Sequence, residues 1–248
     1  MSILLEHVDH AIVVALPLEA RPLRQKLTDP LHLRTDQQRI TLGTFGTQRI
    51  ALIEAGVGQT AAQQATRIVI DGHHPKNIIA AGICGGLSPQ LSHNAIVIPQ
   101  EIGKKNNTSF QTVPTMTEAS HHKKPVEGLL ITEDSVACTI EEKEVLNAST
   151  GAIAVDMESW WIAQEAIHAG IPWGVIRTVS DVASETISSD VAALASIKTT
   201  SRQAGTALRM AWKRPSILVE LAELRENAHQ AASALAAYLF DVLKDDTG

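Results

Sequence analysis

The sequence predicts an α/β fold in which a mainly parallel sheet carries helices on both faces. Short β-branched apolar runs alternate with helical stretches as far as Val179. Strands separated by helices of this length are typical of βαβ units, whose sheets are buried on both faces. The composition agrees, because 44% hydrophobic and 19% charged residues are ordinary values for a globular protein.

The expected strands are short apolar runs that are rich in β-branched residues. The first, Val8–Ala15 (VDHAIVVA), is too short for a helix of its own and is interpreted as a buried strand. Arg39–Leu42 and Arg49–Glu54 are expected to form a hairpin around Gly43 and Gly46. The series continues with Lys76–Ala81, Asn94–Ile98, Gly128–Thr132, Ala152–Val155 and Trp173–Val179.

Helices are expected between these strands and after them. The intervening helices are predicted at Leu18–Leu27, Gln59–Asp71, Ile140–Asn147 and Met157–Ala169. Lys104–Lys124 is polar and interrupts the alternation, so a surface loop is expected there. After Ser184 the chain is expected to be helical to its end, with an interruption at Lys213–Arg214–Pro215, because proline cannot continue a helix interior. No repeat or linker divides the sequence, so residues 1–248 are predicted to form a single domain.

Bulk properties exclude several classes of protein. The net charge is −6 without an extended Lys/Arg run, which argues against a nucleic-acid polymer as partner. Cys84 and Cys138 provide neither a disulfide framework nor zinc-ligand spacing. Met1–His10 carries Glu6 and Asp9 and no basic segment, so a signal peptide is not expected. No apolar run approaches the about 18 residues that a membrane span needs. A cytoplasmic location is therefore predicted.

Chemically capable residues follow several of the predicted strands. Ligands in open α/β sheets bind at the carboxyl ends of the strands. Each feature alone has an ordinary explanation as a tight turn, a helix cap or a favourable charge in the first turn of a helix. Those explanations give no reason for five such features on one edge of a sheet. The five are Glu19, Glu54–Gly58, Gly82–Leu87, Asp156–Ser159 and Ser180–Ala183.

These motifs occur in the order and spacing of the purine and uridine phosphorylase family, which the chain resembles over nearly its whole length. Within that family they look most similar to the 5′-methylthioadenosine/S-adenosylhomocysteine nucleosidases. The pairing of Val155–Asp156–Met157–Glu158 with Ser180–Asp181 carries most of the resemblance. It implies a three-layer α/β/α fold with a central mixed sheet, no metal, no organic cofactor, a purine nucleoside as substrate and a homodimer or larger oligomer.

The resemblance also implies roles for individual residues. Breaking an N-glycosidic bond leaves an oxocarbenium-like sugar and a base that carries negative charge. Asp181 matches the acid that protonates N7 of the purine, with Ser180 beside it to orient the carboxyl group. Glu158 matches the carboxylate that holds the ribose hydroxyls. The other expected substrate contacts are the Met157 thioether, Asp156 in the same motif, Ile83 and Gly85 along the sugar, and Val136 near the position of the family's base-stacking phenylalanine.

Two positions separate hydrolysis from phosphorolysis. The phosphorylases of the family hold phosphate with arginines, whose planar fork suits that anion. This sequence has Glu19 and Ala80 at those positions. Glu19 matches the nucleosidase glutamate that activates water, so water is the expected nucleophile. Arg21 and Arg24 are nearby, and phosphorolysis stays as the alternative.

The sequence departs from the nucleosidase pattern in two places, which limits the choice of substrate. Val136 replaces the stacking phenylalanine, and Val136 as a core residue or Phe110 as the stacking ring are alternatives. The Ser188–Glu226 stretch is longer than in small nucleosidases. Its Met210–Pro215 segment resembles the hopanoid-associated members of the family. That resemblance implies adenine release from an adenosylated lipid as a further alternative. Trp212 in this segment would touch a membrane or, as the simpler interpretation, pack on a neighbouring helix.

Two readings come from other classes of protein. A non-catalytic nucleoside-binding protein would keep Glu158 but would not need both Glu19 and Asp181. A nicotinamide-binding module is disfavoured, because Ala15–Leu16–Pro17–Leu18–Glu19 stands where a GxGxxG turn would follow the first strand.

Overall fold

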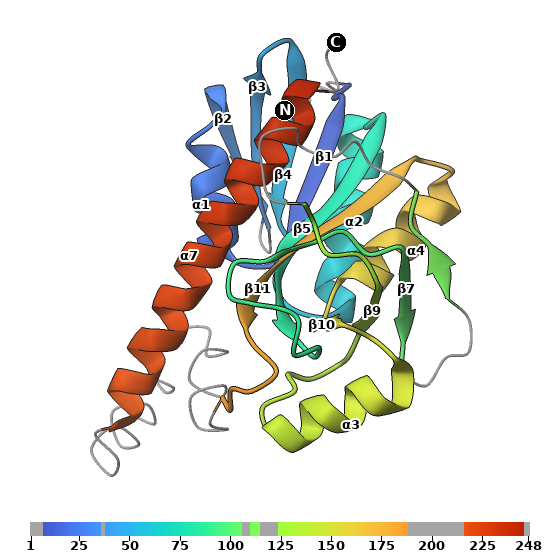
Figure 1. The fold of residues 1–248 in the computed structure, drawn as a ribbon. Helices are drawn as coiled ribbons and strands as arrows, with labels where there is room; N and C mark the ends of the chain where they lie inside the picture. The colour runs from blue at the N-terminus through green and yellow to red at the C-terminus, as the bar shows by residue number, and fades with distance from the viewer. Residues whose placement is uncertain (1–6, 36–37, 106–109, 115–123, 188–215, 246–248) are drawn as a thin grey trace.

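The fold is described by a computed structural model that covers residues 7–35, 38–105, 110–114, 124–187 and 216–245. Its centre is one mixed sheet with helices on both faces (Figure 1). Along the sheet the strands lie in the order β2-β3-β4-β1-β5-β10-β9-β7-β8, and β11 pairs with β5 and β6. The strands are β1 (His10–Val14), β2 (Thr28–Arg34), β3 (Arg39–Phe45), β4 (Gln48–Glu54), β5 (Asn77–Gly86), β6 (Ile96–Val97), β7 (Glu101–Lys104), β8 (Gln111–Thr112), β9 (Leu129–Thr132), β10 (Ala154–Asp156) and β11 (Trp173–Asp181).

The helices form the two outer layers. They are α1 (Pro17–Arg24), α2 (Gln59–His73), α3 (Ile140–Thr150), α4 (Ser159–Ala169) and α7 (Ser216–Asp245). Alternate residues of β1 enter different cores, because successive side chains of a strand point to opposite faces. Ala11 and Val13 pack in the core that α2 and α4 cover, whereas Ile12 and Val14 pack in the core that α1 and α7 cover. The predicted three-layer α/β/α arrangement is confirmed.

Every predicted strand and helix up to Val179 overlaps an observed element, but three strands were not predicted. β2 lies at the edge of the sheet, is largely exposed and contains Pro30, so it lacks the apolar pattern of a buried strand. β7 and β8 pair with each other, and β8 lies inside Lys104–Lys124, where only a loop was expected. The rest of that segment includes residues 106–109 and 115–123, which lie outside the described residues.

The C-terminal region contains the long helix α7, as the sequence predicted. Its Leu235, Tyr238 and Leu239 are fully buried against the sheet and α1. Residues 184–187 are not helical, contrary to prediction. The Met210–Pro215 segment, with Trp212 and the expected interruption, lies outside the described residues. Within the described residues, no helix has the length and apolar character that crossing a membrane requires.

Candidate active site

The site lies where β1, β4 and β10 approach the middle of β5. β1 runs parallel to β4 and to the first half of β5, so the turns after β1 and β4 lie at the level of Gly82. β10 runs antiparallel to the second half of β5, with Val155 opposite Gly85. Asp156 at its carboxyl end therefore points back toward the same place. The turn after β1, the turn after β4, the middle of β5 and the end of β10 come together here, although β10 runs antiparallel to β5.

Glu19 extends from the first turn of α1 to the backbone of β5. Its carboxylate accepts a hydrogen bond from the Leu16 N–H at 2.7 Å and another from the Ile83 N–H at 2.9 Å. Burial raises the pKa of this carboxyl group, although the Ile83 N–H and the Arg177 guanidinium oppose the shift. A buried carboxylate with a raised pKa is suited to accept a proton near neutral pH.

Glu158 lies close to Arg177, Asp156 and Glu19. Among the described residues it forms no direct ion pair. Its Oε1 accepts a hydrogen bond of 2.8 Å from the Gly58 N–H, at the start of α2. Gly58 has φ of 88°, a conformation that glycine adopts without strain. Burial raises the pKa of Glu158 to about 7, and the Asp156 and Glu19 carboxylates raise it too, against the effect of Arg177.

Arg177 is the central cation of this group, and the sequence analysis did not select it. It lies on β11, is 1% exposed, and places Nη2 2.7 Å from Asp156 Oδ2. Burial lowers the pKa of the guanidinium, but the carboxylates of Asp156, Glu158 and Glu19 together raise it above its usual value. A Cβ on residue 82 would collide with the Arg177 guanidinium and the Glu19 carboxylate, so glycine is required there. The sequence did carry a signal for Arg177, which is a lone arginine inside an apolar strand. A buried charge needs an oppositely charged partner, so such an arginine indicates carboxylates nearby.

Asp156 is buried at the end of β10, next to Arg177. Its side chain is 1% exposed and pairs with Arg177. Its Oδ1 accepts a hydrogen bond of 2.7 Å from the Thr132 hydroxyl, and the Ser159 N–H lies 3.2 Å from Oδ2. Protein groups occupy both oxygens, so Asp156 is placed to orient Arg177. Its predicted contact with the substrate stays a prediction.

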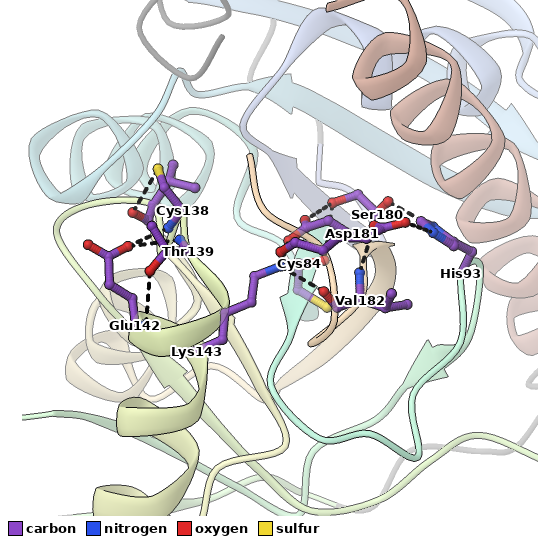
Figure 2. Close-up of polar contacts among 11 residues, drawn as sticks. Cys84, His93, Cys138, Thr139, Glu142, Lys143, Ser180, Asp181 and Val182 are labelled. Atoms are coloured by element: carbon purple, nitrogen blue, oxygen red, sulfur yellow. Dashed lines mark hydrogen bonds and ion pairs between the residues drawn. The ribbon is translucent and has the colours of Figure 1, made fainter. Parts of the chain in front are cut away.

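Asp181 and Ser180 lie at the end of β11, on the other side of β5. The Ser180 hydroxyl donates to Asp181 Oδ1 at 2.8 Å, which is the geometry expected of an orienting group. Lys143 Nζ lies 2.7 Å from Asp181 Oδ2 (Figure 2), a partner that the sequence analysis missed. A Cβ at Gly85 would lie 3.3 Å from Asp181 Oδ2, so this predicted site residue borders the carboxylate.

Comparison with known proteins settles the family. The family model described as the Phosphorylase superfamily matches residues 9–214. The chain belongs to this superfamily. A 5′-methylthioadenosine/S-adenosylhomocysteine nucleosidase of Staphylococcus aureus is 25% identical over 195 residues, which cover 69% of this chain and 86% of that protein. The predicted family is therefore confirmed.

Solved structures of the superfamily confirm the fold. An S-adenosylhomocysteine nucleosidase of Streptococcus pyogenes in complex with 5-methylthiotubericidin has a TM-score of 0.74 at 17% identity, covering 96% of this chain and 97% of that one. A nucleosidase of Colwellia psychrerythraea in complex with adenine has a TM-score of 0.74 at 20% identity, covering 97% of this chain and 96% of that one.

Three further residues were named in the predictions: Val136, Met157 and Phe110. Val136 is 49% exposed on the turn between β9 and α3, so it is not the core residue of the simpler alternative. Met157 is partly buried between Asp156 and Glu158. Phe110 is 44% exposed and lies against Gly103 of β7.

Cys84 lies among the charged groups of the site but is an unsuitable nucleophile. Burial raises the pKa of its thiol, and the nearby Asp156 and Asp181 carboxylates act in the same direction, so the thiolate is disfavoured. Within the described ranges there is no group of three or more His, Cys, Asp or Glu side chains that could hold a metal ion. The groups available for chemistry are carboxylates, a guanidinium, an ammonium and backbone amides.

Proposed function

We propose that this protein hydrolyses the N-glycosidic bond of an adenine nucleoside that carries a 5′-substituent, with water as the nucleophile. The observation that carries the proposal is the pair of carboxylates on opposite sides of β5. Glu19 is buried with a raised pKa, whereas Asp181 is oriented by Ser180. The names of the relatives support adenine nucleosides, because they are nucleosidases and their solved structures contain adenine or 5-methylthiotubericidin.

In the proposed reaction each carboxylate moves one proton. Asp181 donates its proton to N7 of the purine while the bond between C1′ and N9 breaks, and the electrons of that bond stay on the base. Glu19 takes a proton from the attacking water, whose oxygen forms the new bond to C1′. Glu158 binds the ribose hydroxyls with the carboxylate that Gly58 orients. The products are adenine and a free reducing sugar.

The position of the nearby arginines disfavours the phosphorolytic alternative. Arg24 is 2.6 Å from Glu54, and this ion pair competes with any phosphate. Arg21 and Arg24 line a surface pocket of about 380 Å³ together with residues of β2 and β3, and Glu19 is not part of that lining. A buried glutamate in place of an arginine also repels a phosphate dianion.

Nucleosides with different 5′-substituents, incubated with and without phosphate, test the proposal. Adenine and free sugar should appear at the same rate in both conditions. Glu19→Gln should bind substrate and lose turnover, because it keeps the shape and removes the base. Glu165→Gln is the matched control, since that glutamate of α4 pairs with Arg67 of α2 and not with a residue of the site. A sugar 1-phosphate as product would overturn the hydrolase proposal, and binding without turnover would favour a nucleoside-binding protein.

The panel should include a nucleoside with a long apolar 5′-group, because the adenosylated lipid of the sequence analysis stays a candidate. Val57 is 47% exposed next to Gly58, whose N–H holds Glu158, which supports an apolar 5′-substituent. Preference for the long apolar group over methylthio would identify a lipid substrate.

We also propose that the enzyme works in the cytoplasm as a homodimer or larger oligomer. Neither Cys84 nor Cys138 forms a disulfide, which suits a reducing compartment. Light scattering after gel filtration measures the oligomer, and a monomer at working concentration would remove that part of the proposal.

A further inference from the structure

Lys143 is a fully buried lysine whose ammonium group is surrounded by oxygen atoms. Its side chain is 0% exposed, on the first turns of α3. Nζ lies 2.7 Å from Asp181 Oδ2, 2.8 Å from the Val182 carbonyl oxygen and 3.0 Å from the Glu185 carbonyl oxygen. An ammonium group has three N–H donors, and these three acceptors use all of them. The lysine is therefore held in one position.

The start of α3 is built in a way that fixes where Lys143 points. The Thr139 hydroxyl accepts a hydrogen bond of 3.1 Å from the Glu142 N–H, and the Glu142 carboxylate accepts from the Thr139 and Cys138 N–H groups at 3.1 and 2.7 Å. This reciprocal cap satisfies amides that the first turn of a helix leaves free. Figure 2 shows the cap directly beside Lys143.

The turn that follows Asp181 is fixed from a second side. The Glu185 carboxylate accepts a hydrogen bond of 3.1 Å from the Val182 N–H. His93 contacts the same carboxylate at 2.8 Å through Nε2 and the Ser180 carbonyl oxygen at 3.0 Å through Nδ1. Lys143 is thus the member of this network that adds a positive charge next to the Asp181 carboxylate.

We propose that Lys143 is a positioning residue for the proton donor Asp181, and that its charge stabilises the carboxylate that remains after proton transfer. This inference rests on the proposed function. When the O–H bond of Asp181 breaks and the new bond to purine N7 forms, the electron pair stays on the Asp181 oxygen. The ammonium group 2.7 Å away stabilises that developing negative charge, in a site from which water is largely excluded.

The other ionisable groups around Asp181 are Cys84 on β5, Cys138 before α3, and Glu185 with His93 at the exit turn. None of these carries a permanent positive charge, so Lys143 is the group whose removal tests the proposal.

Three single variants test the proposal by steady-state adenine release. Lys143→Met should lower kcat by about 10²-fold with KM changed less than threefold, because the lysine acts on proton transfer and not on substrate binding. Lys143→Arg should recover at least tenfold of the loss, because it restores the charge. Lys76→Met is the matched control, since Lys76 forms a 2.8 Å ion pair with Asp9 on the surface and should keep wild-type activity.

If Lys143→Met folds poorly, a double variant that also carries Asp181→Asn gives a second test. This double variant removes both members of the buried ion pair. On an Asp181→Asn background, Lys143→Met should cause no further loss of kcat, since the lysine acts through Asp181. Wild-type kcat in Lys143→Met, or a further tenfold loss on the Asp181→Asn background, would overturn the inference. A wild-type chain that releases no base from any nucleoside would remove the proposed function, and this inference with it.

Discussion

Buried carboxylates lie on both sides of β5, and the two sides differ in the number of carboxylates for each cation. On one side Glu19, Glu158 and Asp156 surround one buried guanidinium, that of Arg177. Asp156 forms the direct ion pair, at 2.7 Å. The two glutamates bind backbone N–H groups instead, and burial raises the pKa of both.

On the other side one carboxylate has one cation. Asp181 pairs with Lys143 at 2.7 Å and accepts a hydrogen bond from Ser180 at 2.8 Å. The difference indicates how this fold separates the tasks of chemically similar groups. An excess of carboxylates over cations gives groups that take up protons readily, as a base for water requires. A one-to-one pair places a cation directly against the carboxylate that the proposed proton transfer leaves behind.

The most damaging change should be at the one-to-one pair. Asp181→Asn removes the proton donor while it keeps the shape of the side chain, so adenine release should fall by about 10²–10⁴-fold with the fold intact. Rates measured on a purine nucleoside, together with circular dichroism, check this. Activity within threefold of wild type would exclude Asp181 from the mechanism.

The corresponding test among Asp156, Glu158 and Glu19 is the replacement of Arg177, the cation that they share. Arg177→Met should lower the free energy of unfolding by about 3–5 kcal/mol, because it leaves Asp156 buried without its ion-pair partner and Glu158 and Glu19 without a neighbouring cation. Urea unfolding at neutral pH measures the loss. Arg67→Met is the comparison, since that guanidinium is 60% exposed and its loss should destabilise the fold less than the loss of the fully buried Arg177. Equal stability of the two variants would show that the carboxylates do not depend on Arg177.

Local sequence patterns predicted the fold and the carboxylates but neither cation. Apolar runs and turn glycines are local signals, so they placed β1, β5 and β11 and the motifs that follow them. Lys143 stands in the segment Glu141–Glu142–Lys143–Glu144, whose composition is typical of a solvent-facing helix surface. Its partner lies 38 residues away, and only the packing of α3 against the end of β11 brings them together.

Two further features depend on tertiary context in the same way. Asp156 was predicted as a substrate contact together with its motif, and nothing local in the sequence showed that its carboxylate pairs with Arg177. β2 forms by backbone pairing with β3 at the sheet edge, where side-chain burial is small and leaves no period-2 pattern. Pairings over long sequence separation are not encoded in any single segment.

The raised pKa of Glu158 predicts a pH-dependent stability. With a pKa of about 7 in the folded protein against 4.5 as the ordinary value, the folded state binds more protons in this range. The free energy of unfolding should therefore fall as pH rises from about 4.5 and level off above about 7, a change of about 3 kcal/mol. Glu158→Gln should remove this part of the slope in urea unfolding measured at several pH values.

Glu165→Gln is the control for that measurement, because the Arg67 guanidinium holds the pKa of Glu165 below its usual value. Its contribution to stability is present above the ordinary glutamate pKa and is lost as pH falls, which is the opposite sign. A pH profile of Glu158→Gln that is parallel to wild type would show that Glu158 titrates normally in the folded protein.

The smallest expected effect concerns recognition of the sugar by Glu158. Among the described residues the Gly58 N–H binds Oε1, so we expect Oε2 to accept hydrogen bonds from the ribose hydroxyls. A hydrogen bond to a charged group contributes about 1.5–3 kcal/mol, so Glu158→Gln should weaken binding of ribonucleosides tenfold or more relative to their 2′-deoxy analogues. Calorimetric titration with an uncleaved analogue of each sugar measures the two affinities. Equal losses for both sugars would mean that Glu158 supports the turn at Gly58 without contacting the 2′-hydroxyl, and the excess of negative charge around Arg177 would then serve Glu19 alone.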